Sequence, residues 1–335
     1  MRSTQLSGRN WRVWAYTLWI LLWWSLFINN LSIVVSAVNF IVFILPILIN
    51  VAFVTLLERK VLGLRQLRLG PNKISFMGVL QPFRDAIKLL TKQSEANYNV
   101  NWKLFFLRPS IILVTAVMLW SLLPLNINLS KWPIIIISLL VILSLGIYPL
   151  LIRGWASNRK YATLGAIRGV AQTISYEISL ALIVIQFILC YMSYSLVDLQ
   201  YSSIFLIYIF PFVLIIWLVI LLAETNRTPF DFSEGESELV SGFNIEYAST
   251  GFVLIFLREY AIILLFSSAS VVFFTNFVLF RFSSRAISIA LAGVWIILRA
   301  TLPRYRYDLL IRTAWKTYLP LSLGGVSFLV LITTI

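Results

Sequence analysis

Residues 203–238 read SIFLIYIFPFVLIIWLVILLA followed by ETNRTPFDFSEGESE, so an uncharged run leads directly into a loop that is rich in acids. A helix needs about 20 mainly apolar residues to cross the hydrocarbon core of a bilayer. The first part of this stretch is therefore a predicted membrane span. The second part is predicted to be the polar loop that follows the span.

Runs of the same apolar character recur along the whole chain. Of its 335 residues, 60% are hydrophobic and 12% are charged, whereas about 25% are charged in a typical soluble domain. The sequence therefore indicates an all-α polytopic membrane protein with eight spans. The predicted spans are residues 31–57, 109–126, 132–152, 161–190, 203–223, 250–280, 286–302 and 314–333.

The N-terminal part of the chain does not fit this pattern. Residues 13–57 carry no charge and are too many for one ordinary span. We predict that residues 1–30 form a Trp-rich extension, which is either an extra span or a segment at the membrane interface, where Trp is favoured. Residues 31–335 are predicted to form a single membrane domain.

The basic residues predict the orientation of the spans. Loop 58–108 carries ten Lys and Arg, whereas the loops on the opposite side carry few. By the positive-inside rule, the loops after odd-numbered spans face the cytoplasm or the matrix. Orientation accounts for the net charge of +14, so we predict that these residues meet membrane lipid and that the chain binds no nucleic acid.

Loop 58–108 is also predicted to contain an amphipathic helix. Phe83, Ile87 and Leu90 recur at spacings of four and three, and basic residues stand between them. Such a pattern is typical of a helix with one apolar face. The sequence leaves open whether this helix lies among lipid headgroups, packs against a partner or is simply solvated.

The side chains that most often hold metals and cofactors are scarce. Cys190 is the one cysteine of the chain and there is no histidine. This composition excludes a disulfide framework, a zinc site, an iron–sulfur cluster and haem held by His or Cys. The chain also has no glycine-rich phosphate loop, so we predict that it binds neither a metal nor a nucleotide.

The acidic residues are concentrated in one loop. Six of the 13 acids fall within 23 positions, although crowded carboxylates repel and lose hydration near lipid. Such a set titrates jointly and can take up or release protons. The alternative is a solvated loop that docks onto a basic partner. The six are Glu224, Asp231, Glu234, Glu236, Glu238 and Glu246.

Two further acids lie inside predicted spans. Glu177 follows Tyr176 in the fourth span, and Glu259 follows Arg258 in the sixth. An ionisable residue in a span indicates a functional site because its charge is costly in lipid. The alternative for Glu177 is a protonated core residue. The adjacent Arg258 weakens the case that Glu259 carries protons, because a cation favours the charged carboxylate.

Seven stretches of sequence together resemble one known family, membrane subunit 1 of respiratory complex I, the proton-pumping NADH–quinone oxidoreductase. The similarity runs from about residue 35 to the C-terminus. The stretches are ERKVLG (58–63), RLGPN (68–72), LQPFRDAIK (80–88), WASNRKY (155–161), RGVAQTISYE (168–177), the acidic loop that begins at Glu224 and continues through SGFNIEY (241–247), and RATLPRYRYD (299–308).

This resemblance implies a role within a larger enzyme. The family forms the membrane side of the quinone chamber and the start of a polar path toward antiporter-like subunits. Ubiquinone would be the substrate, and this chain would hold no flavin, metal or nucleotide, no catalytic residue and no complete active site. The implied partners are the other complex I subunits, in the mitochondrial inner membrane or, as the alternative, a bacterial plasma membrane.

The resemblance also assigns the site residues. Arg59, Arg299 and Arg304 would line the quinone chamber or its entrance, although arginines at span ends also snorkel to the interface. Phe230 and Phe256 are candidates for the apolar tunnel, although packing or lipid-facing phenylalanines are commoner. The predicted proton path comprises Tyr176, Glu177, Glu224, Asp231, Glu234, Glu236, Glu238, Glu246 and Glu259.

Three other functions remain open on the sequence alone. A quinone-site-like subunit of a membrane hydrogenase shares these motifs but needs no quinone. A stand-alone cation transporter would use the acidic loop as its ion site, but such transporters more often contain two repeated halves. A structural anchor for a peripheral arm would affect assembly without affecting turnover.

Overall fold

The computed structural model describes residues 38–74, 76–92, 101–123, 134–201, 211–232, 235, 247, 249–275 and 281–334. These residues form helices and loops, and none of them lies in a strand. The chain divides into two compact units, residues 1–50 and 51–335. Residues 38–50 are the described part of the first unit, and they belong to the helix Val38–Arg65.

Seven helical segments among the described residues are long and apolar enough to cross a membrane, which confirms the all-α polytopic prediction. The predicted span 203–223 is represented by a shorter apolar helix, and residues 1–30, with their possible extra span, lie outside the described residues. The segments are Val38–Arg65, α3 (Trp102–Leu122), α4 (Ile135–Leu145) with α5 (Ile147–Ser157), α6 (Lys160–Tyr191), α11 (Ser249–Phe274), α12 (Arg281–Thr301), and α13 (Tyr307–Thr313) with α14 (Leu319–Thr334); the shorter helix is α9 (Pro211–Glu224).

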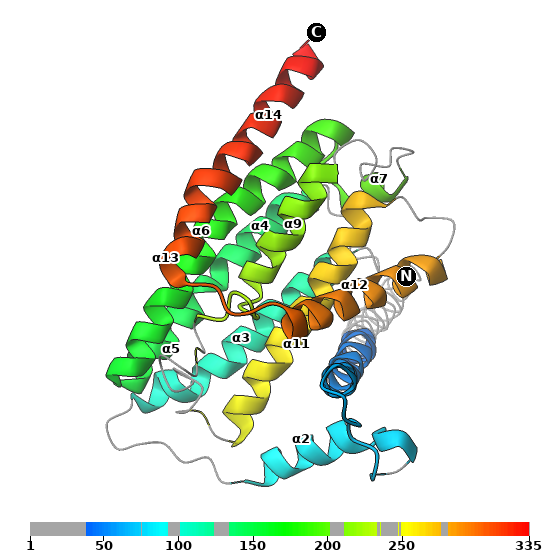
Figure 1. Cartoon of the computed structure of the whole chain (residues 1–335), viewed down its shortest axis with the longest axis vertical. Coiled ribbons are helices and arrows are strands. Elements are labelled where there is room, and N and C mark those ends of the chain that lie inside the picture. Colours follow the sequence, from blue (N-terminus) through cyan, green and yellow to red (C-terminus); the bar gives the residue numbers. More distant parts are fainter. Residues whose placement is uncertain are drawn as a thin grey trace, which may run out of the picture. The chain divides into compact units, whose positions relative to one another are not determined.

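Helix α6 is the element around which several others pack. It contacts α5, α9 and α14, and Figure 1 shows α14 lying along it. Small residues such as Ala162, Gly165 and Ala166 are buried on its surface. Because membrane helices associate largely through close packing, small residues at the contact let the backbones approach. A Cβ atom on Gly154 of α5 would stand only 2.4 Å from the Cβ of Ala166.

Helix α11 packs against α3 and α12 and closes the opposite side of the bundle. A buried aromatic cluster joins α11 to α6 and α9. Phe187 stacks on Phe273 with ring centroids 4.8 Å apart, and Trp217 donates its indole N–H to Ser270 at 3.0 Å. The indole of Trp217 is thus satisfied in a region without water, as membrane interiors require.

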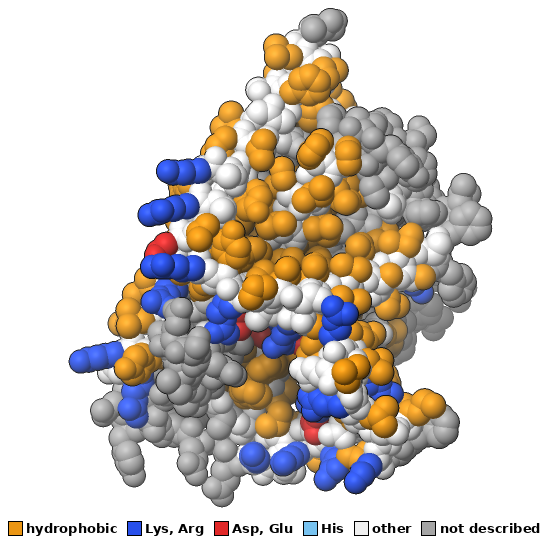
Figure 2. Space-filling view, in the orientation of Figure 1, with side chains coloured by type: hydrophobic (Ala, Val, Ile, Leu, Met, Phe, Trp, Pro, Cys, Tyr) orange, Lys and Arg blue, Asp and Glu red, His pale blue; other side chains and the backbone are white. Residues whose placement is uncertain are grey.

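The predicted amphipathic helix is present as α2 (Gln81–Thr91). Phe83 packs edge-on against Phe53 of the first span with ring centroids 6.0 Å apart, whereas Ile87 and Leu90 are exposed. On the face shown in Figure 2, Lys and Arg side chains lie from the level of α13 and the base of α14 down to α2, and hydrophobic side chains cover the rest of α14. This asymmetry is the one that the positive-inside rule predicts.

The contact between α5 and α6 yields a stability prediction. Gly154→Ala should destabilise the protein by about 1–3 kcal/mol, because the new methyl group overpacks the interface. The matched control is Gly293→Ala in α12, where nothing lies within 4 Å of the added atom. Thermal unfolding in detergent should give a lower Tm for the first variant alone; equal Tm values would contradict close packing at Gly154.

Candidate functional site

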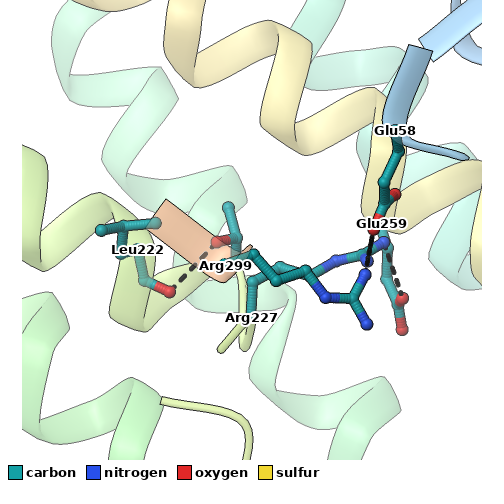
Figure 3. A network of polar contacts seen from close by, with 6 residues as sticks. Glu58, Leu222, Arg227, Glu259 and Arg299 are labelled. Carbon is teal, nitrogen blue, oxygen red and sulfur yellow. Dashed lines mark hydrogen bonds and ion pairs between the residues drawn. The ribbon is translucent and has the colours of Figure 1, made fainter. Parts of the chain in front are cut away.

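One carboxylate receives two guanidinium groups from distant parts of the chain. Glu58, near the end of the first span, is 5% exposed. Arg299 of α12 and Arg227 of the loop after α9 both reach its Oε1 atom, the latter at 3.4 Å. Figure 3 shows these side chains converging. The two cations offset the cost of burying this carboxylate.

Arg227 extends this network into α11. Its Nη2 atom lies 3.8 Å from Oε2 of Glu259, and its guanidinium stands 4.5 Å from the ring centroid of Tyr260. Burial alone lowers the pKa of Arg227, but Tyr260, Glu58 and Glu259 outweigh burial and raise the pKa above its ordinary value. Arg227 therefore stays charged and joins the two carboxylates.

A small cavity adjoins this network. It has a volume of about 20 Å³ and is lined by Glu58, Arg227, Tyr260, Trp295 and Arg299, among others. A cavity of roughly 10–15 Å³, measured as space for a water probe, accommodates one water molecule. The cavity therefore has room for about one water and is too small for a quinone ring.

The end of α9 is fixed by an amide from α6. Gln172 is fully buried, and its side-chain nitrogen donates to the backbone oxygens of Ala223 at 2.8 Å and Phe230 at 2.9 Å. These bonds fold the loop back onto α6 immediately after Glu224. The Oε2 atom of Glu224 is buried, and this side chain interacts electrostatically with Arg258 and Glu177.

A second ion pair closes the same loop from the other side. Asp231 lies 3.5 Å from Arg304, and the backbone N–H of Tyr305 donates to the Pro229 oxygen at 3.0 Å. Phe230 lies between two tyrosines, with its ring centroid 5.9 Å from that of Tyr305 and 6.3 Å from that of Tyr176. The loop therefore packs between α6 and the segment that follows α12.

The five predicted quinone residues lie in different surroundings within the described part of the chain. Arg59 lines one cavity and Arg299 another, and each of the three predicted arginines meets a carboxylate. Phe230 is buried in loop packing, and the ring of Phe256 is tilted against that of Phe252 with ring centroids 4.3 Å apart. Their quinone-binding role stays a prediction.

The predicted proton-path residues fall into two groups. Tyr176, Glu177, Glu224, Asp231 and Glu259 belong to the helices and loop described above. The remaining four, Glu234, Glu236, Glu238 and Glu246, lie outside the described residues.

Sequence reasoning missed four residues that organise this site. Glu58, Arg227 and Tyr260 form the ion network, and Gln172 fixes the loop. Glu58 carried a usable signal, because an acid at the end of a span needs a cation nearby. Arg258, noted as a complication for Glu259, interacts electrostatically with both Glu259 and Glu224.

A larger basic cleft lies beside the network, between the end of the first span, the following loop and α2. It has a volume of about 740 Å³ and its basic lining residues are Arg59, Arg68, Lys73 and Arg84. Within the described part of the chain, Arg59 alone of these four forms an ion pair, with Asp85. This cleft therefore presents excess positive charge to whatever lies against it.

Comparison with known proteins identifies the family of this chain. Residues 38–330 match the family described as NADH dehydrogenase. The chain belongs to the NADH dehydrogenase family. It is 45% identical over 302 residues to "NADH-ubiquinone oxidoreductase chain 1" of Aedes aegypti, covering 88% of this chain and 95% of the relative. The protein of that name from Strongylocentrotus purpuratus is 45% identical over 305 residues, covering 88% and 94% of the two chains.

A vertebrate relative in the NADH dehydrogenase family is nearly as similar. The protein of the same name from Balaenoptera physalus is 43% identical over 303 residues, which cover 86% of this chain and 93% of the relative. The segment matched by the family contains Glu58, Arg227, Glu259 and Arg299. The ion network therefore belongs to the family domain and not to the N-terminal extension.

The network in this member of the NADH dehydrogenase family can be tested through Glu58. Glu58→Gln should lower the free energy of unfolding by about 2 kcal/mol. This is less than the roughly 3–5 kcal/mol for breaking a fully buried pair, because Arg299 is 35% exposed. The matched control is Asp308→Asn, because its ion-pair partner Arg306 is 80% exposed. Losing this exposed pair should lower the free energy of unfolding by less than about 1 kcal/mol. Thermal unfolding in detergent measures both; similar losses would contradict a structural role for the network.

Proposed function

We propose that this chain is the membrane subunit that forms the membrane side of the quinone site in a proton-pumping NADH–ubiquinone oxidoreductase, and that it begins the proton-coupling path. Ubiquinone is the substrate of the assembled enzyme, and this chain alone supplies no complete active site. The names and 43–45% identities of the relatives support this function. They favour it over a membrane hydrogenase subunit or a stand-alone cation transporter.

The observation that carries the proposal is the row of alternating charges Arg299, Glu58, Arg227 and Glu259. The row begins at the last turn of α12, where loops face the basic side of the protein, and ends on α11 inside the membrane. Charges in a region of low dielectric interact strongly over several ångströms. A change of charge at one end therefore alters the ionisation of groups at the other.

This row explains how quinone reduction can be coupled to proton movement. A reduced head group carries negative charge until it has taken up two protons, and it attracts nearby guanidinium groups. When an arginine turns toward the head group, Glu58 loses part of the positive charge that compensates its own charge. Glu259 and Glu224 then pass the change toward Glu177 and Tyr176 in the centre of α6.

The proposed partners and location follow from the same assembly. The soluble arm of the enzyme would lie against the basic loops, and antiporter-like membrane subunits would receive the proton path. The basic cleft of Arg68, Lys73 and Arg84 would hold acidic side chains of the soluble arm, because opposite charges steer such contacts. The animal relatives support a mitochondrial inner membrane location.

Glu177→Gln in the assembled enzyme tests the proton path. The rate of quinone reduction coupled to pumping should fall roughly tenfold or more. A proton-transfer group raises the rate by a factor of about 10²–10⁴ where proton transfer is rate-limiting. Quinol formation and proton uptake into vesicles are measured on the same preparation. The control is Asp198→Asn, an exposed acid whose hydrogen bonds within the described part of the chain are local ones with Ser195. Normal reduction together with normal pumping in Glu177→Gln would exclude Glu177 from the path.

Charge reversal tests the partner contact. Arg68→Glu combined with Lys73→Glu should release the soluble arm at lower salt than in the parent enzyme, because ionic contacts are screened by salt. The matched control is Lys88→Glu, which makes the same kind of change on α2 outside the cleft. Retention of the arm is measured by sedimentation across a salt series. An unchanged release point for the double variant would rule out the cleft as a docking site.

A further inference from the structure

The last span contains one turn that is wider than an α-turn. Residues Ala314–Tyr318, between α13 and α14, form a π-helix. The backbone N–H of Leu319 donates to the oxygen of Ala314, five residues earlier, instead of to the residue four positions back. Turns of this kind are rare, and they occur frequently at functional sites.

The sequence supplies a cause for the wide turn. Pro320 stands two residues after it, beyond Leu319, and has no backbone N–H to donate. A proline ring inside a helix also collides with the carbonyl group four residues earlier, which here belongs to Lys316. The helix therefore cannot continue as a regular α-helix through this turn, and an alanine at position 320 would remove both obstacles.

The wide turn faces the part of α6 that carries Tyr176. The indole N–H of Trp315 donates to Oγ of Ser175 at 3.3 Å, and the ring centroid of Tyr318 lies 6.2 Å from that of Tyr176. Just before the turn, the oxygen of Leu310 accepts a bond from the Tyr176 hydroxyl at 3.5 Å. Figure 1 shows α13 and α14 alongside α6.

Tyr176 is packed between residues of different elements. Its side chain is fully buried, and its ring neighbours both Phe230 of the loop after α9 and Tyr318 of the wide turn. In an α-helix each residue adds about 100° of rotation. If the turn tightened, Trp315 and Tyr318 would rotate relative to Leu310, so the three contacts could not all be kept.

We propose that Pro320, Trp315 and Tyr318 are positioning residues for Tyr176. Pro320 holds the turn open, and the open turn directs Trp315 and Tyr318 onto α6. These contacts keep the Tyr176 hydroxyl at the Leu310 carbonyl, beside Glu177 and the loop that follows Glu224. The inference rests on the proposed function, because it assigns these residues to the proton path of the same site.

Stability and proton coupling separate a positioning role of Pro320 from a purely structural one. Proline inside a helix destabilises it, so Pro320→Ala should leave the span at least as stable as before. If the wide turn positions Tyr176, the same substitution should nevertheless impair proton coupling. Stability and coupling therefore change in different directions, and the two roles can be separated in one variant.

The experiment uses the assembled enzyme that contains this chain. The variants are Pro320→Ala, Trp315→Phe, Tyr176→Phe, and the double variant Pro320→Ala with Tyr176→Phe. The control is Pro109→Ala, which makes the same change inside the membrane helix α3. Protons pumped per quinol formed, quinol formation alone and thermal stability are measured for each.

The expected result is a severalfold lower pumping ratio in Pro320→Ala and Trp315→Phe, with unchanged assembly and an unchanged ratio in Pro109→Ala. The double variant should be no worse than Tyr176→Phe, because both substitutions act through the same side chain. A normal pumping ratio in Pro320→Ala and Trp315→Phe, beside a lowered ratio in Tyr176→Phe, would overturn the positioning role alone. A normal ratio in Tyr176→Phe would instead remove Tyr176 from the proposed path. A parent enzyme that forms no quinol would refute the proposed function.

Discussion

The shared carboxylate of Glu58 is the interaction on which the candidate site depends. Arg299 and Arg227 come from positions far apart in the chain, and both would be costly near lipid without an anion. Their common partner brings the end of α12 and the loop after α9 to the end of the first span. The same contact leaves Arg227 in reach of Glu259, which carries the network into α11.

Packing around the loop after α9 gives this network its fixed geometry. Gln172 holds the backbone on both sides of the loop, Arg304 pairs with Asp231, and Phe230 fills the space between two tyrosines. Hydrogen bonds and ion pairs between buried groups are strong in a region of low dielectric, so they favour one arrangement of the loop. Glu224 and Glu177 are therefore held close enough to interact electrostatically, although they lie on different helices.

Much of the architecture could be predicted from the order of the residues. The apolar runs predicted the spans because lipid demands about 20 apolar residues and full backbone bonding in each. The recurrence of Phe83, Ile87 and Leu90 at spacings of four and three predicted α2. The boundaries were less certain: the first span was predicted to end at residue 57, but the helix continues to Arg65, because long basic side chains can extend from a helix end toward water.

The sequence by itself determined the class of protein, the spans, the basic side and the concentration of acids in one loop, because each depends on composition or on local periodicity. The tertiary structure alone decided that Glu58 joins Arg227 and Arg299, that Phe230 packs inside the loop and that Trp315 and Tyr318 face Tyr176. Those pairings connect residues separated by more than 50 positions. They depend on how helices pack in three dimensions, which no local pattern of residues records.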